Sequence, residues 1–502
     1  MEQSSKSTSG SLPSSTPAWR ALGSLAEDVL AQARAGRDIR LGDLHALPLS
    51  APAMTVDGSR LVMTDDALGR LFDLGRERRL EARRDAMLRG DVVNRSEQRA
   101  ALHALLRDVG GAVCRSGAEA LRSSVDATRA RMRALAEQVH SAERAASRGS
   151  PVTDVVNIGI GGSEFGARLV CDALQDLAPR GRRIHFVSSV DGLEIARLAE
   201  RVHPPGTLFV VSSKSFSTVE TLLNAKTLRA WSDERGLDAE QHWFAVTGKS
   251  GAAEAFGIPS ANVFDVPDYV GGRFSAWGSV GLPAALYLGW PLFEQWLKGG
   301  SAADSHFATT PLEANLPVRL ALMNVWNTTF LGCSSHCVVS YDYRLAQFLP
   351  WLQQLEMESN GKSVTEDGIA VDYPTAPVVW GGLGNNGQHT YFQLLREGTG
   401  PKAITVIGTK TASSRYPEHA AELDAHRRGQ VTALSRGTSA GSFNSVSQLM
   451  LDDLGPSQLG ALMATFEHAT VCSGWLWGIN SFDQPGVEFG KQVARQLRAG
   501  TG

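Results

Sequence analysis

Hydroxyl groups and one ammonium group gather in a short segment of this 502-residue chain, which contains Ser213, Lys214, Ser215 and Thr218. A strand-like run at residues 207–211 precedes the segment, and a helical pattern follows it. Hydroxyls, free backbone N–H groups and the positive end of a helix dipole together suit a phosphate monoester. The segment therefore predicts a phosphate-binding loop. A Ser/Thr-rich helix cap with a solvated lysine is the alternative interpretation.

A second turn, at residues 159–162, also lies between a strand-like run and a helical pattern. Glycine lets backbone N–H groups come close to a ligand, so Gly162 and Ser163 are candidate binding residues unless the turn is only structural. The dinucleotide fingerprint G-x-G-x-x-G fails here, because Glu164 stands where its third glycine belongs. This mismatch argues against a nicotinamide-dependent oxidoreductase.

Arg273 follows a Gly-Gly pair within residues 268–278. The two glycines let the backbone bend sharply, which can hold the guanidinium beside a cavity. An arginine in that position can stabilise a negatively charged intermediate. A structural arginine bonded to backbone carbonyls is equally compatible with the pattern.

Two carboxylates and one histidine are possible proton-transfer groups. Glu356 and Glu358 lie at the end of a helical pattern that Gly361 is expected to stop. A carboxylate at this end opposes the helix dipole, which is unfavourable unless the group has a task. The two glutamates are two residues apart, so only one can face a given pocket. His389, at a loop–helix junction, can shuttle protons near neutral pH, although such a histidine is more often a packing residue.

Short β-rich runs alternate with helical stretches from residue 147 onward, in two successive rounds. This alternation predicts an α/β fold of two doubly wound parallel sheets covered by helices. The preceding part of the chain shows helical periodicity without strand runs. The expected segments are a disordered tail at 1–17, a helical layer at 18–146, α/β domains at 147–300 and 301–480, and a C-terminal segment at 481–502.

The composition excludes several classes of protein. Hydrophobic residues make up 43% and charged residues 20%, as in ordinary globular proteins. A formal net charge of -3 argues against a nucleic-acid binder. No apolar run suits a membrane span, and the N-terminus lacks the apolar core of a signal peptide. The five scattered cysteines form no complete zinc site and suit reduced thiols in a cytoplasmic protein.

Taken together, these blocks resemble the glucose-6-phosphate isomerase family, also called phosphoglucose isomerase, in family order from residue 94 to 491. The segments around Arg273 and at residues 474–491 are similar to the family's two diagnostic motifs. The resemblance implies two sugar-isomerase (SIS-type) domains. It also implies reversible isomerisation of glucose 6-phosphate and fructose 6-phosphate through a cis-enediolate, in glycolysis and gluconeogenesis. No metal and no other cofactor is expected.

The resemblance further assigns roles to single residues. Glu358 matches the base that moves a proton between C2 and C1, and Arg273 matches the group that stabilises the enediolate. His389 and Lys491 match residues at the ring-opening end, with His389 supplied by the other subunit of a homodimer. The matching substrate contacts are Gly162 and Ser163 beside the sugar, Ser213, Lys214, Ser215 and Thr218 around the phosphate, and Gln484.

The sequence departs from the family pattern in places. Gly382 and Leu383 stand where Glu-Pro is frequent, in the loop that bears His389. The chain also ends soon after Lys491, which affects the expected dimer contact more than the chemistry. Two further functions remain compatible with the sequence. One is an isomerase of a related hexose phosphate, and the other is a non-catalytic sugar-phosphate sensor, which would not need Glu358 together with His389.

Overall fold

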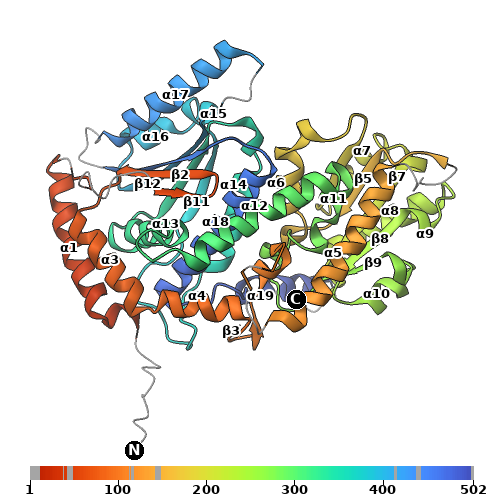
Figure 1. Cartoon of the computed structure of the whole chain (residues 1–502), viewed down its shortest axis with the longest axis horizontal. Helices are drawn as coiled ribbons and strands as arrows, with labels where there is room; N and C mark the ends of the chain where they lie inside the picture. Colours follow the sequence, from red (N-terminus) through yellow and green to blue (C-terminus); the bar gives the residue numbers. More distant parts are fainter. Residues whose placement is uncertain are drawn as a thin grey trace, which may run out of the picture.

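The computed structural model describes residues 12–37, 39–41, 49–111, 113–114, 118–141, 149–411, 415–436 and 443–498, without the side chains of Glu488, Lys491 and Arg498. Two sheets with helices packed on them form the two halves of the molecule, and the N-terminal segment, red to orange, runs along both (Figure 1). The predicted α/β fold with parallel sheets is therefore confirmed. Residues 1–11 of the expected tail lie outside the described residues, and a 3-10 turn, η1 (Pro13–Ser15), already lies within it.

The first sheet has the strand order β6-β5-β7-β8-β9, and all neighbouring strands are parallel. Its strands are β5 (Asp154–Ile158), β6 (Arg183–Val187), β7 (Thr207–Ser212), β8 (Trp243–Thr247) and β9 (Val263–Asp265). The helices of this half are α6 (Phe165–Ala173), α7 (Gly192–Ala199), α8 (Val219–Asp233), α9 (Ala239–His242), α10 (Ser250–Ala255) and α11 (Leu282–Leu288). Its 3-10 turns are η5 (Gly161–Ser163), η6 (Gln175–Leu177), η7 (Pro204–Gly206), η8 (Ser260–Asn262), η9 (Gly272–Phe274) and η10 (Ser279–Gly281). β5, β7 and β8 are buried along their full length, because both faces of the sheet are covered.

The order of these strands creates a topological switch point at the carboxyl edge of the first sheet. β5 pairs with β6 on one side and with β7 on the other. The chain therefore adds β6 on one side of β5 and then crosses to the other side, where it adds β7, β8 and β9. The loops that leave β5 and β7 consequently diverge to opposite faces of the sheet. Ligands of open parallel sheets bind at such a switch point, and both predicted binding loops follow these two strands.

The second sheet has the order β1-β2-β13-β12-β10-β11. Its parallel strands are β10 (Ser335–Ser340), β11 (Val378–Leu383), β12 (Lys402–Thr409) and β13 (Asn444–Leu451). The helices of this half include α12 (Trp290–Thr309), α13 (Leu316–Val325), α14 (Phe348–Gln353), α15 (Gly384–Gln388), α16 (Phe392–Glu397), α17 (Pro417–Ser435) and α18 (Pro456–Trp477). Two π-helical turns, η11 (Trp326–Phe330) and η13 (Gln354–Glu358), continue α13 and α14, and η12 (Tyr343–Leu345) precedes α14.

The N-terminal segment contributes strands as well as helices. Its helices are α1 (Pro17–Arg34), α3 (Asp65–Glu77), α4 (Leu80–Arg89), η2 (His103–Arg107) and α5 (Glu119–His140), and its strands include a small hairpin of β3 (Val92–Asn94) and β4 (Arg99–Ala100). β1 (Leu49–Ala51) and β2 (Met54–Arg60) form a second hairpin, and β2 pairs antiparallel with β13. The prediction that strands are absent here was wrong. Only Met54 and Val56 of β2 are buried, because this strand near the sheet edge needs few apolar residues.

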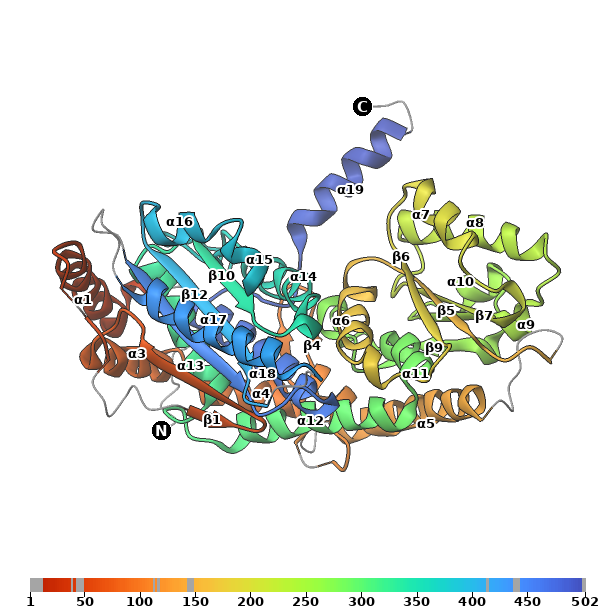
Figure 2. The same ribbon diagram turned by 90° about the horizontal axis from the view of Figure 1, so that it is seen from above.

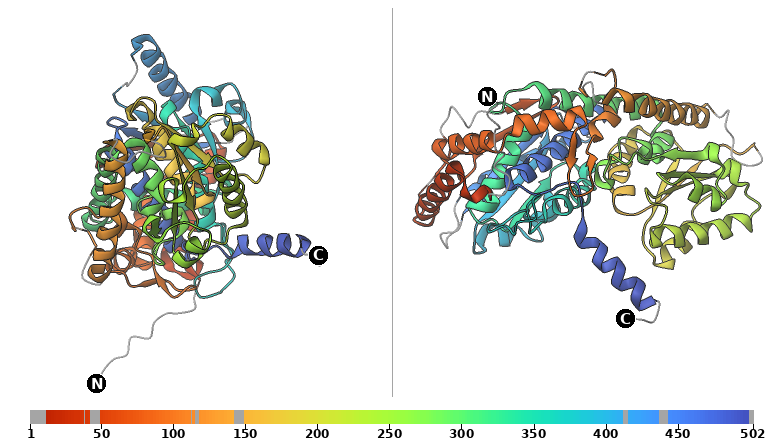
Figure 3. Two further views of the ribbon diagram at one scale, coloured as in Figure 1. Left: turned by 90° about the vertical axis from the view of Figure 1, so that its right-hand side faces the viewer. Right: turned by 90° about the horizontal axis from the view of Figure 1, so that it is seen from below.

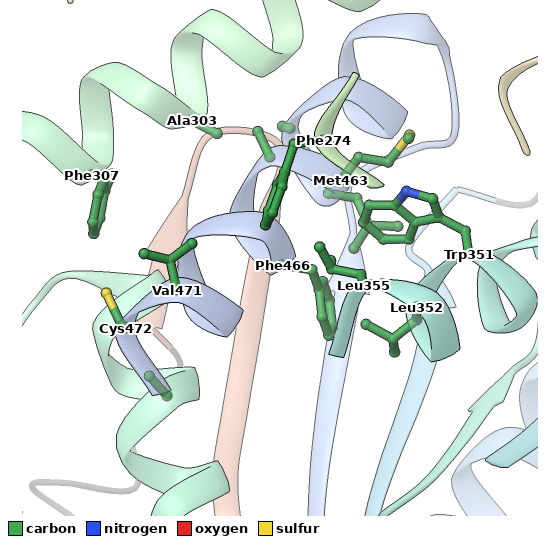
Figure 4. Close-up of a cluster of buried hydrophobic side chains, with 14 of the residues drawn as sticks. Phe274, Ala303, Phe307, Trp351, Leu352, Leu355, Met463, Phe466, Val471 and Cys472 are labelled. Atoms are coloured by element: carbon green, nitrogen blue, oxygen red, sulfur yellow. The ribbon is translucent and has the colours of Figure 1, made fainter. Parts of the chain in front are cut away.

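Helix α18 forms the buried centre of the second half. It crosses α12 so closely that a Cβ atom on Gly460 would lie 2.1 Å from the carbonyl oxygen of Trp296. Figure 4 shows Met463 and Phe466 of α18 in one cluster with Phe274 and Leu355. The cluster therefore anchors the residues that adjoin Arg273 and the η13 turn. None of the helices in the described residues combines the length and the apolar composition that a bilayer crossing requires.

Helix α19 (Pro485–Arg498) leaves the body of the molecule at its first residues. Figures 2 and 3 show it extending away from both halves, toward its C-terminal end. Val493 and Leu497, one helical turn apart, are exposed on it. Its position is therefore decided by the segment immediately before it.

A buried ion cluster ties the N-terminal segment to α12 and α18. Arg107 of η2 donates from Nε and Nη2 to the two carboxylate oxygens of Asp304, both at 2.8 Å, and from Nη1 to Glu467. His468 contacts Asp304 through Nε2 at 2.6 Å. All four side chains are essentially inaccessible to solvent, and burial raises the pKa of Glu467 to about 7.

Removal of one partner from this cluster is expected to destabilise the protein strongly. Asp304→Ala leaves the Arg107 guanidinium buried without its bidentate partner, which typically costs about 3–5 kcal/mol of the free energy of unfolding. Urea unfolding of the parent and the variant measures this loss. Glu294→Ala is the control, because it breaks the exposed Lys298–Glu294 pair and should cost less than about 1 kcal/mol. A comparably small loss for Asp304→Ala would contradict the prediction.

Candidate active site

The start of the loop after β5 packs against the end of β7 at the carboxyl edge of the first sheet. A Cβ atom on Gly159 would lie 2.9 Å from the carbonyl oxygen of Ser212, so glycine is needed for this approach. Asn157 of β5 connects the loops, since it donates to the carbonyl of Ser163 (3.0 Å) and accepts from the Ser212 hydroxyl (2.7 Å). The sequence analysis did not identify Asn157, although a polar residue inside an apolar strand is a usable signal.

The loop at residues 213–218 has the geometry of an anion site. It ends at the first turn of α8, and the hydroxyl of Thr218, the N-cap residue, makes no capping hydrogen bond. The Ser213 hydroxyl donates to Thr218 Oγ1 at 3.3 Å, while Ser215 is exposed. Phe216 adopts a left-handed backbone (φ 46°) with its ring buried, so packing overrides backbone strain in this loop. N–H groups at a helix start, together with hydroxyls, can hold a phosphate group.

Lys214 connects this loop to the segment that leads to Arg273. Its ammonium donates to the carbonyl oxygens of Asp268 and Val270, both at 2.9 Å. Burial lowers the pKa of Lys214 from its usual value. The interpretation of a solvated lysine is therefore not supported.

The turn that carries Arg273 rests directly on the loop after β5. A Cβ atom on Gly162 would lie 2.2 Å from the carbonyl carbon of Gly272, so the two backbones are in contact. The hydroxyl of Ser275 donates to the carbonyl of Gly272 at 2.6 Å, which fixes the turn from its other side. Close backbone packing thus requires glycine at position 162, whereas a Cβ atom on Gly271 or Gly272 would meet its neighbours only at 3.5 Å or more.

Arg273 itself clamps two distant segments of the chain. Its Nε donates to the hydroxyl of Ser359 at 2.7 Å, and its Nη2 donates to the carbonyls of Ser481 (2.6 Å) and Asp483 (3.0 Å). Burial lowers the pKa of this arginine, although neighbouring carboxylates oppose the shift. An arginine remains protonated even so.

The remaining guanidinium nitrogen of Arg273 faces the predicted base. Nη1 donates to Gln484 Oε1 at 3.0 Å and lies 3.6 Å from Glu358 Oε2. The side chain of Arg273 is 2% exposed and that of Glu358 is 22% exposed. Solvent can therefore reach the carboxylate, whereas the guanidinium is buried next to it. Arg273 therefore binds backbone carbonyls, as the structural interpretation expects, and also lies beside the carboxylate of Glu358. Its role in stabilising a charged intermediate stays a prediction.

A π-helical turn decides which glutamate faces the site. Glu356 is buried, and its carboxylate accepts from Asn324 (3.1 Å), Asn360 (3.1 Å) and the Thr470 hydroxyl (2.9 Å). Burial raises the pKa of Glu356. Glu358 faces Arg273 instead. The prediction that the two carboxylates point to different faces is confirmed, and π-helical turns are frequent at functional sites.

Gln354 is a residue of this site that the sequence analysis missed. Its Nε2 lies 3.1 Å from the position that a Cβ atom on Gly161 would take, so its amide faces the loop after β5. It stands four residues before Glu358 on a helical segment. That spacing places side chains on neighbouring positions of a helix surface and was a usable signal.

The described contacts do not connect His389 or Lys491 with Glu358 and Arg273. His389 follows α15 and is exposed, and its backbone N–H donates to the carbonyl of Asn386 at 3.1 Å. Among the described residues, no hydrogen bond or ion pair joins His389 to Glu358 or Arg273. Lys491 lies on α19, and its side chain is outside the described part of the structure.

The comparison with family models decides the relationship of this chain. The model described as phosphoglucose isomerase matches residues 57–501. The chain belongs to the phosphoglucose isomerase family. Glucose-6-phosphate isomerase of Cupriavidus metallidurans is 41% identical over 478 residues, covering 91% of this chain and 88% of the relative. That of Polaromonas naphthalenivorans is also 41% identical, over 500 residues, covering 96% and 94%.

Solved structures of phosphoglucose isomerase relatives agree with this assignment. The crystal structure of a glucose-6-phosphate isomerase from Chlamydia trachomatis has a TM-score of 0.85 and 30% identity, covering 97% of this chain and 96% of the other. A hypothetical protein from Thermus thermophilus has a TM-score of 0.70 and 28% identity. The fold expected from the family resemblance is thus confirmed over nearly the whole chain.

In this member of the phosphoglucose isomerase family, the site has two chemically different ends. One end is the hydroxyl-rich loop at the start of α8. The other end holds the accessible carboxylate of Glu358, the buried cation of Arg273 and the amide of Gln484. Lys214 links the two ends, because its ammonium binds the carbonyls of Asp268 and Val270 in the segment that leads to Arg273.

Proposed function

We propose that this protein interconverts glucose 6-phosphate and fructose 6-phosphate. The observation that carries the proposal is the accessible carboxylate of Glu358, which lies 3.6 Å from the buried guanidinium of Arg273. Lys214 of the loop at residues 213–218 binds the segment that leads to Arg273, which supports a phosphate site near this pair. Phosphoglucose isomerase family membership supports the same reaction. The reaction would serve glycolysis and gluconeogenesis.

The chemistry follows from the acidity of the sugar. The ring must open first, because the cyclic form hides the carbonyl group. Glu358 then removes the proton on the carbon next to the carbonyl and returns it to the adjacent carbon. The intermediate enediolate carries negative charge, which Arg273 stabilises from its fixed position. The reaction is an internal proton transfer that consumes no oxidant or reductant, so no redox cofactor is needed.

The other predicted residues complete this scheme. Ser213, Lys214, Ser215 and Thr218 hold the phosphate, and Gly162 and Ser163 lie beside the sugar. Gln484 orients Arg273 and contacts the substrate. His389 and Lys491 assist ring opening.

We further propose a homodimer in the cytoplasm, with two shared active sites. Two observations support the shared site. His389 is exposed at the end of α15, and no described hydrogen bond or ion pair connects it to Glu358 of its own chain. Gly381 and Gly382 lie at the end of the edge strand β11, and the short helix α15 leads from there to His389, so this histidine lies at the rim of the second sheet. A second chain could therefore receive this histidine at its own site.

A coupled assay tests the proposed function. Fructose 6-phosphate is supplied, and a dehydrogenase specific for glucose 6-phosphate reports the product. Steady turnover is the expected result. Mannose 6-phosphate and glucosamine 6-phosphate, assayed by their own products, test the related-substrate alternative. Binding of fructose 6-phosphate without turnover would favour the sensor and refute the proposal.

The phosphate loop makes a separate prediction. Lys214→Met removes an ammonium from the edge of the anion site, so KM for fructose 6-phosphate is expected to rise about 10-fold. This corresponds to the loss of one hydrogen bond to a charged group. Because the phosphate is bound in the ground and transition states alike, kcat should fall less than KM rises. Steady-state kinetics measure both. Lys249→Met, at an exposed lysine beyond the next strand, is the control, and an unchanged KM for Lys214→Met would contradict the assignment.

A further inference from the structure

Lys362 is a buried cation whose role the reaction scheme does not explain. Its ammonium donates to four backbone carbonyls, those of Glu358 (3.2 Å), Ser359 (2.7 Å), Asn480 (3.0 Å) and Asp483 (2.9 Å). It also lies 3.3 Å from a carboxylate oxygen of Asp483, and 9% of its side chain is exposed. An ammonium has three protons, so Lys362 is surrounded by more acceptors than it can satisfy at one time.

These acceptors belong to two segments with different tasks. Glu358 and Ser359 end the helical segment that presents the proposed base, where the last carbonyls have no intrahelical partner. Asn480 and Asp483 form the segment immediately before α19, which here is called the α19 root (residues 480–484). A cation at a helix C-terminus also offsets the dipole that a carboxylate there opposes.

We infer that Lys362 is a positioning residue, which ties the backbone of Glu358 to the α19 root and so holds the base in register with Gln484. The inference rests on the proposed function, because it assigns Glu358 the proton transfer. Lys362 touches backbone groups and one carboxylate, and it acts on the reaction through Glu358.

A second cation holds the same root from the other side. Arg273 donates to the carbonyls of Ser481 and Asp483, so Asp483 accepts from both Arg273 and Lys362. Residues 94–96 add a third attachment, because Asn480 donates to Asn94 Oδ1 at 2.9 Å and to Ser96 Oγ at 2.8 Å. The Ser481 hydroxyl also donates to Asn360 Oδ1 at 2.7 Å, so the root keeps three attachments when Lys362 is replaced. We expect a shift of Glu358 relative to the root, without loss of the fold.

The charge of Lys362 responds to its surroundings. Burial and the neighbouring Arg273 lower its pKa to about 8, while Asp483 and Glu358 act in the opposite direction. These three side chains are the charged groups that face Lys362 from η9, from the root and from η13. As the pH rises through about 8, the ammonium loses a proton and one donor. The attachment of the Glu358 backbone to the α19 root is then weaker, so kcat is expected to decline on the alkaline side.

Lys362→Met and Lys362→Arg test the inference, with Lys298→Met as the control at a lysine whose side chain is 54% exposed. The methionine variant is expected to lower kcat about 100-fold, as a small misplacement of a reacting group does. Its KM should stay within about threefold, since the phosphate loop is untouched. The arginine variant keeps its proton at alkaline pH, so its decline of kcat should move upward by about one pH unit or more.

Backbone hydrogen–deuterium exchange supplies a readout that does not depend on catalysis. Amides of residues 354–361 and of the α19 root should exchange faster in Lys362→Met than in the parent. The melting temperature should fall by only a few degrees, because other hydrogen bonds still hold both segments. A parent-like kcat, unchanged exchange in both segments, or an alkaline decline that arginine leaves in place would each overturn the inference. If the parent itself showed no isomerase activity, the proposed function would fail, and the exchange data would still decide whether Lys362 joins the two segments.

Discussion

Glu358→Gln is expected to lower kcat for isomerisation by about 100- to 10,000-fold, the range that a general base contributes. Glutamine keeps the shape of the side chain beside Arg273, but an amide cannot accept the proton from the sugar. Substrate should still bind, because the loop at residues 213–218 is unchanged, so KM should stay within a few-fold. Initial rates with fructose 6-phosphate measure the loss. In deuterated water, the variant should also incorporate far less deuterium at C2 of glucose 6-phosphate.

Glu356→Gln is the matched control for this prediction. The Glu356 carboxylate accepts three hydrogen bonds from Asn324, Asn360 and Thr470, and it does not face Arg273. In the variant, the NH2 group of glutamine would face a side chain that donates to the carboxylate in the parent. The variant should therefore lose more stability than activity per folded molecule. The opposite result, an inactive but stable Glu356→Gln beside an active Glu358→Gln, would mean that the wrong carboxylate has been assigned.

Co-expression of Glu358→Gln with His389→Ala is expected to restore activity to two inactive proteins. If each site combines Glu358 of one chain with His389 of the other, a mixed dimer has one site with both defects and one intact site. Activity should then recover to about one functional site per mixed dimer, because both substitutions fall in the same site and the other site keeps both native residues. Differently tagged chains allow mixed dimers to be purified and assayed.

The pair Glu358→Gln and Arg273→Lys serves as the negative control. These side chains lie 3.6 Å apart in the same chain, so every site of a mixed dimer keeps one defect and no recovery is expected. Mixed dimers of Glu358→Gln and His389→Ala that remain inactive would refute the shared site, while the isomerase assignment would stand.

The sequence was sufficient to predict most of the first sheet and its two loops. β5, β7 and β8 are buried on both faces, and such strands have continuous apolar sequences that local patterns reveal. The glycine turn and the hydroxyl-rich loop follow two of these strands directly, so parallel pairing alone places both at one edge. The roles of His389 and Lys491 stay predictions, since they rest on the family resemblance.

Other features depended on contacts between residues that are distant in the sequence. The β1–β2 hairpin joins the second sheet through backbone hydrogen bonds to β13, which need no particular side chains. The loop expected before His389 is in fact the end of β11, which runs to Leu383, and the short helix α15. Glycine-rich sequence alone cannot distinguish these possibilities, because glycine is compatible with strands, turns and loops.

What the sequence by itself determined about this protein is therefore the type of fold and the family, because these depend on local periodicity and on motifs of short spacing. The reacting groups that the family resemblance assigns stay predictions. Only the tertiary structure decided how the groups are held. The π-helical turn turns Glu358 toward Arg273 and buries Glu356. Lys362 then joins that turn to a segment more than a hundred residues away. Such an ammonium satisfies backbone carbonyls, which every residue carries, so no local pattern marks its partners.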